Sequence, residues 1–293
     1  QIVKCFRDED LRADRQPEFT QLDMEMSFVD IDDIICVIEG LMVKVYKEIK
    51  GIDLATPFPR LTYKEAMERY GSDKPDIRFG MELKDLSNIL LNTEFKVFYN
   101  AIKNGGSVRA LNAEGCGFKL SRKDIDSLGE FVKIYKAKGL AWINITEEGI
   151  KSPITKFMSQ QEIDEILRKM DAKIGDIIFI VADKDNIVYD SLGQLRLELA
   201  RKFDLINEDK LGLLWVTEFP LLEFDEEEGR YVAVHHPFTS PMDEDMELLD
   251  KEPGKVRAKA YDIVLNGYEL GGGSIRIHDS QLQEKMFKLL GFS

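Results

Sequence analysis

The first 27 residues contain two stretches of alternating side chains on either side of a charged loop. Residues 2–9 and 18–27 have the pattern of extended arms, in which alternate side chains point to the same face. Arg7 and Glu9 therefore share one face of the first arm. The second arm has one polar face, formed by Gln21, Asp23 and Glu25, and one apolar face, formed by Leu22, Met24 and Met26. This pattern predicts a β-hairpin with an apolar back and an ionisable front that suits a charged ligand.

The composition limits the class of protein. A chain of 293 residues with 44% hydrophobic content predicts about two domains. Its net charge of −14 has the wrong sign for a protein that works mainly by binding nucleic-acid backbones, so any RNA contact needs local basic patches. The three cysteines are far apart and lack the spacing of a zinc site, which favours a reducing compartment. With neither a membrane-spanning run nor a signal peptide, the sequence predicts a soluble cytoplasmic protein.

Periodic patterns predict the regular elements that follow the hairpin. Apolar residues at steps of three and four predict an amphipathic helix from Asp30 to Lys50, ended by Gly51. Irregular residues 71–80 then indicate a domain boundary near their end. Beyond it, we predict helices over 93–104, from Ser121 to Gly139 and over 159–170, and strands over 107–113, 140–146 and 177–182. The last strand is apolar enough to be buried on both faces, and we expect the helices on one side of a small sheet.

The last third of the chain predicts hairpins and a pair of neighbouring carboxylates. Extended runs over 211–224 and 230–235 flank an acidic turn, and Asn266-Gly267 is the favoured two-residue hairpin turn. That turn pairs Val264 with Glu269 and sets Asp262 diagonal to Glu269, at roughly 5–8 Å between Cβ atoms. Two carboxylates this close repel unless a cation such as Mg²⁺ lies between them, although two acids on a solvated edge are the alternative. Glycines 271–273 follow directly and let a ligand approach the backbone.

Several of these segments resemble one family. Arg7, Glu9 and the run Arg15 to Gln21 closely resemble motif 2 of the class II aminoacyl-tRNA synthetases, in the form found in bacterial-type aspartyl-tRNA synthetases. Residues 106–111, 138–143 and 175–176 resemble the GAD domain inserted in those enzymes. The resemblance implies an α+β fold, in which residues 1–78 and 206–293 form the class II antiparallel sheet flanked by helices. Residues 79–205 would be the inserted α+β GAD domain, serving either as a tRNA contact or as a rigid spacer.

The resemblance also implies roles for individual side chains. Residues 267–276 are similar to the family segment Gly-Tyr-Glu-Leu-Gly-Gly-Gly-Ser-x-Arg, in which the glutamate serves ATP and metal and the arginine clamps the aspartate side chain. Glu269 and Arg276 match these positions, and arginine's planar fork suits a carboxylate. The remaining implied roles are Arg7 on the α-phosphate and the substrate carboxylate, Glu9 and Gln16 on the adenylate side of ATP, Asp23 on the substrate ammonium group, His235 beside bound aspartate, and Asp262 with Glu269 on Mg²⁺.

The activity implied by the resemblance is that of an ATP-dependent ligase. Aspartate and ATP would give aspartyl-adenylate, and the aspartate would then pass to tRNA(Asp). The family's anticodon-binding barrel, motif 1 with its homodimer interface, and motif 3 fall outside the matching segment, so we expect a fragment that is inactive alone. The alternative from another class is a non-catalytic module that binds an acidic amino acid or tRNA. The motif residues present in the chain favour the enzyme.

Overall fold

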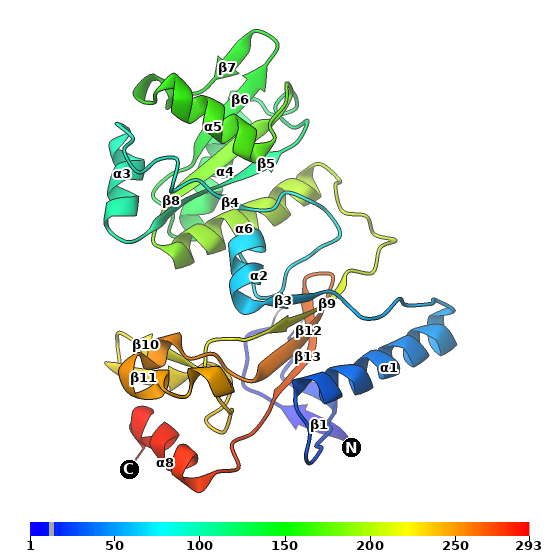
Figure 1. Ribbon diagram of the computed structural model, residues 1–293. Helices are drawn as coiled ribbons and strands as arrows, with labels where there is room; N and C mark the ends of the chain where they lie inside the picture. The colour runs from blue at the N-terminus through cyan, green and yellow to red at the C-terminus, as the bar shows by residue number, and fades with distance from the viewer. Residues whose placement is uncertain (12–14, 293) are drawn as a thin grey trace. The chain divides into compact units, whose positions relative to one another are not determined.

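The computed structural model describes residues 1–11 and 15–292 (Figure 1). It is a mixed α/β structure of helices and antiparallel sheets, which agrees with the predicted combination of helices and antiparallel strands. Two compact units are present: unit 1 comprises residues 1–60, 217–263 and 268–293, and unit 2 comprises residues 61–216 and 264–267. The assignment of residues 79–205 to an inserted domain stays a prediction. Within the described ranges, no helix is long and apolar enough to cross a membrane.

Unit 1 contains two small hairpins, one long helix and a third hairpin that contributes to the candidate site. Its elements are β1 (Ile2–Phe6), β2 (Glu18–Leu22), α1 (Ile31–Lys50), β10 (Leu222–Asp225), β11 (Arg230–Ala233), α7 (Leu248–Lys251), β12 (Ala260–Leu265), β13 (Tyr268–Ser274) and α8 (Ser280–Leu289). The last two residues of β12 belong to unit 2. The pairs β1–β2 and β10–β11 are antiparallel, and β12 is the neighbour of β13.

The first hairpin is shorter than predicted. Strands β1 and β2 pair from Ile2 with Leu22 to Phe6 with Glu18, and the Asp23 N–H donates to the Gln1 carbonyl. The predicted apolar back is not buried: Leu22, Met24 and Met26 are all exposed. Helix α1 agrees with its prediction, since Asp30 caps its start and Gly51 ends it in the left-handed conformation at φ +68°.

Unit 2 is built on a five-stranded antiparallel sheet in the order β4-β5-β8-β6-β7. The strands are β4 (Lys84–Asp85), β5 (Ser107–Ala113), β6 (Ala141–Thr146), β7 (Gly149–Lys151) and β8 (Ile177–Asp183). The helices are α2 (Tyr63–Tyr70), α3 (Lys96–Lys103), α4 (Arg122–Ile134), α5 (Gln160–Met170) and α6 (Asp185–Lys202). The short strand β3 (Arg60–Thr62) and strand β9 (Leu213–Thr217) are neighbours of each other and belong mostly to unit 2.

Helices cover both faces of this sheet, so the prediction that they lie on one side is wrong. Alternate residues of β8 enter two separate cores: Phe179 packs with residues of α4 and α6, whereas Ile178 packs with residues of α3 and α5. The physical reason is that β8 is apolar on both faces and that β5 contributes Val108 to one core and Leu111 to the other, so both faces must leave water. The prediction that β8 is buried on both faces is thereby confirmed.

Several element boundaries differ from the sequence prediction. Helix α3 starts at Lys96 because the Thr93 hydroxyl accepts from the Phe95 N–H in a local turn and does not cap the helix. Helix α4 ends at Ile134, well before Gly139, because Lys136 takes the left-handed conformation at φ +70°.

The extended run predicted over residues 211–224 is also interrupted. Strand β9 ends at Thr217, the next residue, Glu218, has φ +57°, and β10 begins only at Leu222. A non-glycine residue with positive φ stops the strand here, although nothing in its residue type announces it.

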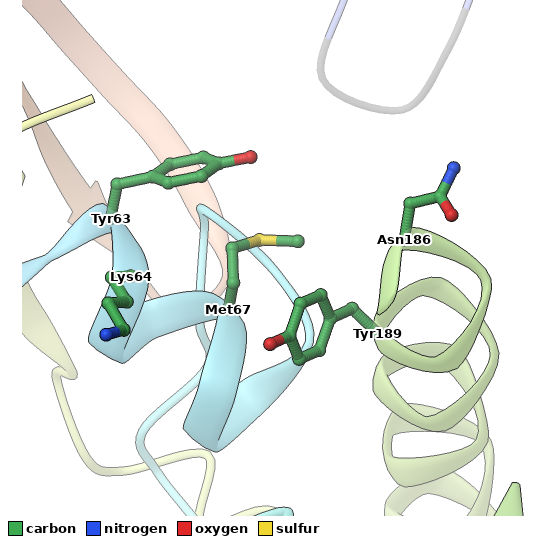
Figure 2. A pocket seen from close by; sticks show the side chains of 5 residues that line it. All are labelled: Tyr63, Lys64, Met67, Asn186 and Tyr189. Atoms are coloured by element: carbon green, nitrogen blue, oxygen red, sulfur yellow. The ribbon is translucent and has the colours of Figure 1, made fainter. Parts of the chain in front are cut away.

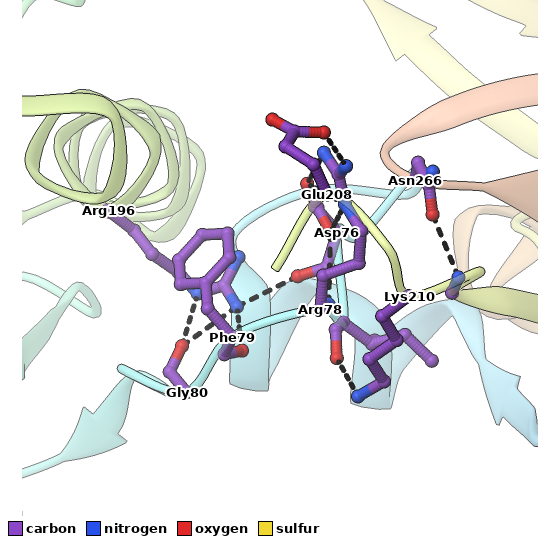
Figure 3. A network of polar contacts seen from close by, with 10 residues as sticks. Asp76, Arg78, Phe79, Gly80, Arg196, Glu208, Lys210 and Asn266 are labelled. Carbon is purple, nitrogen blue, oxygen red and sulfur yellow. Dashed lines mark hydrogen bonds and ion pairs between the residues drawn. The ribbon is translucent and has the colours of Figure 1, made fainter. Parts of the chain in front are cut away.

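A buried arginine organises the loop that precedes β4 (Figure 3). Arg196 of α6 is 1% exposed and donates hydrogen bonds to the carbonyls of Asp76, Phe79 and Gly80 at 2.8–3.1 Å. The Phe79 ring centroid lies 3.9 Å from the guanidinium carbon, so the cation also stacks on an aromatic face. Burial lowers the pKa of Arg196 to about 10, and the side chain therefore remains charged at pH 7.

The same loop is held at its start by a second arginine. Arg78 donates to both carboxylate oxygens of Asp76, at 2.8–3.2 Å, and to Glu208 at 2.6 Å. Burial alone raises the pKa of Asp76, but the hydrogen bonds from Arg78 outweigh it and hold that pKa below its usual value. The irregular stretch predicted as a boundary is thus an ordered loop.

Replacing Arg196 should destabilise unit 2 strongly. Arg196→Met leaves several buried carbonyls without donors, and we expect it to lower the free energy of unfolding by about 3 kcal/mol or more. Urea unfolding measures this, with Arg168→Met at an exposed position of α5 as the control, expected within about 0.5 kcal/mol of the parent. Equal stability of the two variants would show that the loop finds other donors.

Candidate active site

The side chains predicted as site residues all belong to unit 1. They come from three places: the β1–β2 hairpin with its loop, the segment after β11, and the β12–β13 hairpin with the residues that follow it. A separate shallow cavity of about 270 Å³ lies in unit 2 and contains none of them (Figure 2). Its lining is Tyr63, Lys64, Met67, Asn186 and Tyr189.

The hairpin presents Arg7 and Glu9 together, as predicted. The Arg7 N–H donates to the Pro17 carbonyl at 2.9 Å, which continues the pairing beyond β1 and anchors this residue. The Arg7 Nη1 lies 3.7 Å from the Glu9 Oε1, and the guanidinium carbon lies 5.2 Å from the Phe19 ring centroid. The Arg7 side chain is nevertheless 55% exposed, and Gln16 is exposed too. Both can therefore reach a ligand.

Asp23 lies at the end of the hairpin and is tied there through its backbone. Its N–H and carbonyl pair with Gln1 at 2.9 and 2.7 Å. Its side chain is exposed and makes no hydrogen bond or ion pair within residues 1–11 and 15–292. The structure therefore does not join the Asp23 carboxylate to the other predicted site residues.

An ion pair links the loop of this hairpin to β13. The Arg15 Nη2 donates to the Glu269 Oε2 at 2.8 Å, and the two side chains are 31% and 25% exposed. Sequence analysis assigned Arg15 no role, although it stands inside the motif run. No local pattern predicts a partner 254 positions away.

The β12–β13 turn has the predicted geometry. Asn266 and Gly267 take φ values of +54° and +85°, which are the left-handed values that a two-residue hairpin turn requires. Beyond the turn, Asp262 of β12 is 6% exposed, so one of the two predicted metal ligands is a buried carboxylate.

The glycines at positions 271–273 leave room for the protein's own side chains as well as for a ligand. A Cβ on Gly272 would lie 2.0 Å from the Asp262 Oδ1, and a Cβ on Gly273 would lie 2.8 Å from the Tyr261 Oη. Only Gly271 faces open space. The interpretation that these glycines admit a ligand therefore applies to Gly271, whereas the next two admit Asp262 and Tyr261.

The two adjacent histidines have different surroundings. The His235 Nε2 lies 4.0 Å from the Asp262 Oδ1, and its ring packs edge-on to Phe219 with centroids 4.6 Å apart. His236 instead accepts a hydrogen bond from the Phe238 N–H at its Nδ1, at 3.1 Å. Burial and the charge of Arg276 lower the pKa of His236, which favours the neutral form of its ring. His235 thus adjoins the predicted metal ligand Asp262, whereas His236 is close enough to be affected by the charge of Arg276.

Arg276 presents an exposed positive charge at the same site. Its backbone forms an antiparallel bridge with Thr239, which fixes its position, and its side chain forms no ion pair with any described residue. Burial raises the pKa of Tyr261, and the charge of Arg276 opposes that rise. Sequence analysis missed Tyr261, because only the contact with Gly273 reveals that its hydroxyl lies against the site strand.

The residues that the structure describes contain no preformed cluster for a metal. Across the described part of the chain, no group of three or more histidine, cysteine, aspartate or glutamate side chains is arranged to hold an ion. Asp262 lies near His235, and Glu269 is paired with Arg15. Two carboxylates still suit Mg²⁺, which commonly binds one or two of them and takes its other ligands from water and substrate phosphates. The predicted metal pair stays a prediction.

Comparison with known proteins assigns the family. The model of the class II tRNA synthetases (D, K and N) matches residues 1–293, and the chain therefore belongs to this family. It is 66% identical over 293 residues to the aspartate–tRNA ligase of Clostridium botulinum strain Kyoto, type A2. It is 64% identical over 294 residues to the aspartate–tRNA ligase of Clostridium perfringens strain 13, type A. Each match covers 100% of this chain and 49% of the relative, so the chain spans about half the length of these curated relatives.

A side chain at Gly272 should displace Asp262. Gly272→Ala places a methyl group where the Asp262 carboxylate lies, and we expect it to lower the free energy of unfolding by about 1–3 kcal/mol. Gly271→Ala is the matched control, because that position is open, and we expect a change within about 0.5 kcal/mol. Urea unfolding of the two variants compares them. Equal effects would refute the close contact.

Proposed function

We propose that this chain is the catalytic part of an aspartate–tRNA ligase. Membership of the class II family and the relatives named aspartate–tRNA ligase support this proposal. The observation that carries it within the site is the Arg276 guanidinium, which is exposed and forms no ion pair in the described ranges. A planar cation held by a strand bridge suits the side-chain carboxylate of L-aspartate and discriminates against the neutral amide of asparagine.

The proposed reaction joins aspartate to ATP and then to tRNA(Asp). An α-carboxylate oxygen attacks the α-phosphorus, the bond to the bridging oxygen of pyrophosphate breaks, and aspartyl-adenylate forms. The terminal ribose hydroxyl of tRNA then attacks the acyl carbon and AMP leaves. Positioning and charge neutralisation account for catalysis of this kind, with little acid–base work.

Each candidate side chain has a role in this proposal. Arg7, held against Phe19 and beside Glu9, is exposed enough to bind the α-phosphate and the substrate carboxylate together. The other proposed roles are Glu9 and Gln16 on the adenylate side of ATP, His235 beside the bound aspartate, and Asp23 on its ammonium group. Asp262 and Glu269 would hold Mg²⁺, which when bound neutralises phosphate charge.

The finer architecture and the partners belong to the same proposal. We assign residues 1–78 and 206–293 to the class II core, supported by the β12–β13 hairpin beside the predicted site residues. We assign residues 79–205 to an inserted GAD domain, supported by a five-stranded sheet whose strands all lie within residues 84–183. The proposal also includes a homodimer that works in the cytoplasm.

Amino-acid selectivity tests the role of Arg276. In the protein as its gene encodes it, we expect L-aspartate to be activated at least about 100-fold better than L-asparagine, because the amide leaves the guanidinium without a charge partner. Aspartate-dependent exchange of pyrophosphate into ATP measures this. Arg276→Gln should abolish the preference, while Arg168→Gln in unit 2 should retain it. Equal activation of both amino acids by the parent, or no activation of either, would contradict the proposal.

Magnesium dependence tests the role of Glu269. We expect Glu269→Gln to reduce adenylate formation about tenfold or more at limiting Mg²⁺, while the free energy of unfolding changes by less than about 1 kcal/mol. Glu223→Gln, an exposed position on β10, is the control and should behave as the parent. Superimposable Mg²⁺ titrations of the Glu269 variant and the parent would mean that this carboxylate is structural.

A further inference from the structure

We propose that Arg15 binds the Glu269 carboxylate and competes there with the divalent cation. This inference rests on the role of Glu269 in the proposed function. Its direct basis is the hydrogen-bonded ion pair of 2.8 Å between the Arg15 Nη2 and the Glu269 Oε2. In this proposal Arg15 competes with the cation and has no role in binding the substrate.

The burial of this pair separates it from ordinary surface ion pairs. Arg15 and Glu269 are 31% and 25% exposed, whereas Lys4 and Glu18 of the same hairpin are 69% and 54% exposed at a similar distance of 2.6 Å. Partial removal from water strengthens the attraction between opposite charges, and it makes an unpaired carboxylate more costly. Arg15 thus supplies a positive partner for the Glu269 carboxylate.

The competition follows from charge and geometry. A carboxylate oxygen that accepts a guanidinium N–H is blocked in that direction, and a divalent ion placed beside the guanidinium is repelled by it. The cation therefore binds Glu269 only when Arg15 moves away. Because the guanidinium is delocalised and always charged, the pair persists at any pH at which Glu269 is ionised.

Whether removal of Arg15 tightens or weakens cation binding distinguishes competition from the other roles that Arg15 could have. If Arg15 competes with the cation, its removal tightens cation binding. If Arg15 only orders the loop or binds substrate, its removal weakens binding or leaves it unchanged. An ion pair of this type contributes up to about 1 kcal/mol, so we expect binding roughly two- to fivefold tighter.

The experiment uses Mn²⁺ as the probe and needs no catalysis. Electron paramagnetic resonance of the free ion gives the affinity of the protein, as its gene encodes it, in the absence of ATP. We expect Arg15→Gln to bind Mn²⁺ roughly two- to fivefold more tightly than the parent. Arg15→Lys, which keeps the charge, should stay closer to the parent. Lys4→Gln removes the same charge from the same hairpin without touching Glu269, so its affinity should match that of the parent.

Glu269→Gln distinguishes this inference from the proposed function. If it weakens Mn²⁺ binding while Arg15→Gln binds no more tightly than Lys4→Gln, the competition is refuted and the metal role of Glu269 stands. If Glu269→Gln and the parent bind Mn²⁺ equally, both ideas are refuted. Circular dichroism of each variant shows whether it is folded, and Arg15→Ala, judged by the same criterion, replaces Arg15→Gln if that variant is unfolded.

Discussion

The candidate site depends on the close packing of two β12 side chains against glycines of β13, which have no side chain of their own. Asp262 and Tyr261 lie where Cβ atoms of Gly272 and Gly273 would stand. This contact keeps the Asp262 carboxylate buried and near His235. It leaves Gly271 facing open space, and the same strand leads on to Arg276. A larger residue at either packed glycine would move a site carboxylate or the tyrosine ring.

Charge balance is the second principle of the site. Glu9 and Glu269, which the proposed function assigns to ATP and to Mg²⁺ respectively, each lie beside an arginine: Glu9 beside Arg7, and Glu269 beside Arg15. Arg276, by contrast, has no ion pair among the residues described. The arrangement thus places a positive charge beside each of these two carboxylates and leaves the Arg276 guanidinium ready for an anion, which fits the proposed binding of ATP and an acidic amino acid.

Unit 2 shows how far local sequence rules extend. Strand β5 and helix α5 agree with their predicted bounds, because the Gly105-Gly106 pair before the strand and the capping box of Ser159 are local signals. Helix α4 ends early because a lysine takes the position for which glycine is the expected signal. The sequence predicted the loop before β4 only as an irregular stretch, because the side chain that orders it, Arg196, belongs to α6 and is far away in the chain.

The sequence by itself determined the family resemblance, the long helix α1, the Asn266-Gly267 turn and the residue types of the site. Each of these depends on residues that lie close together in the chain. It also placed Arg7 beside Glu9, since alternation along one strand needs no partner. Only the tertiary structure decided that Arg15 meets Glu269, that His235 meets Asp262, and that helices cover both faces of the unit 2 sheet. These contacts join residues distant in sequence, and they are set by how whole elements pack, which no local pattern encodes.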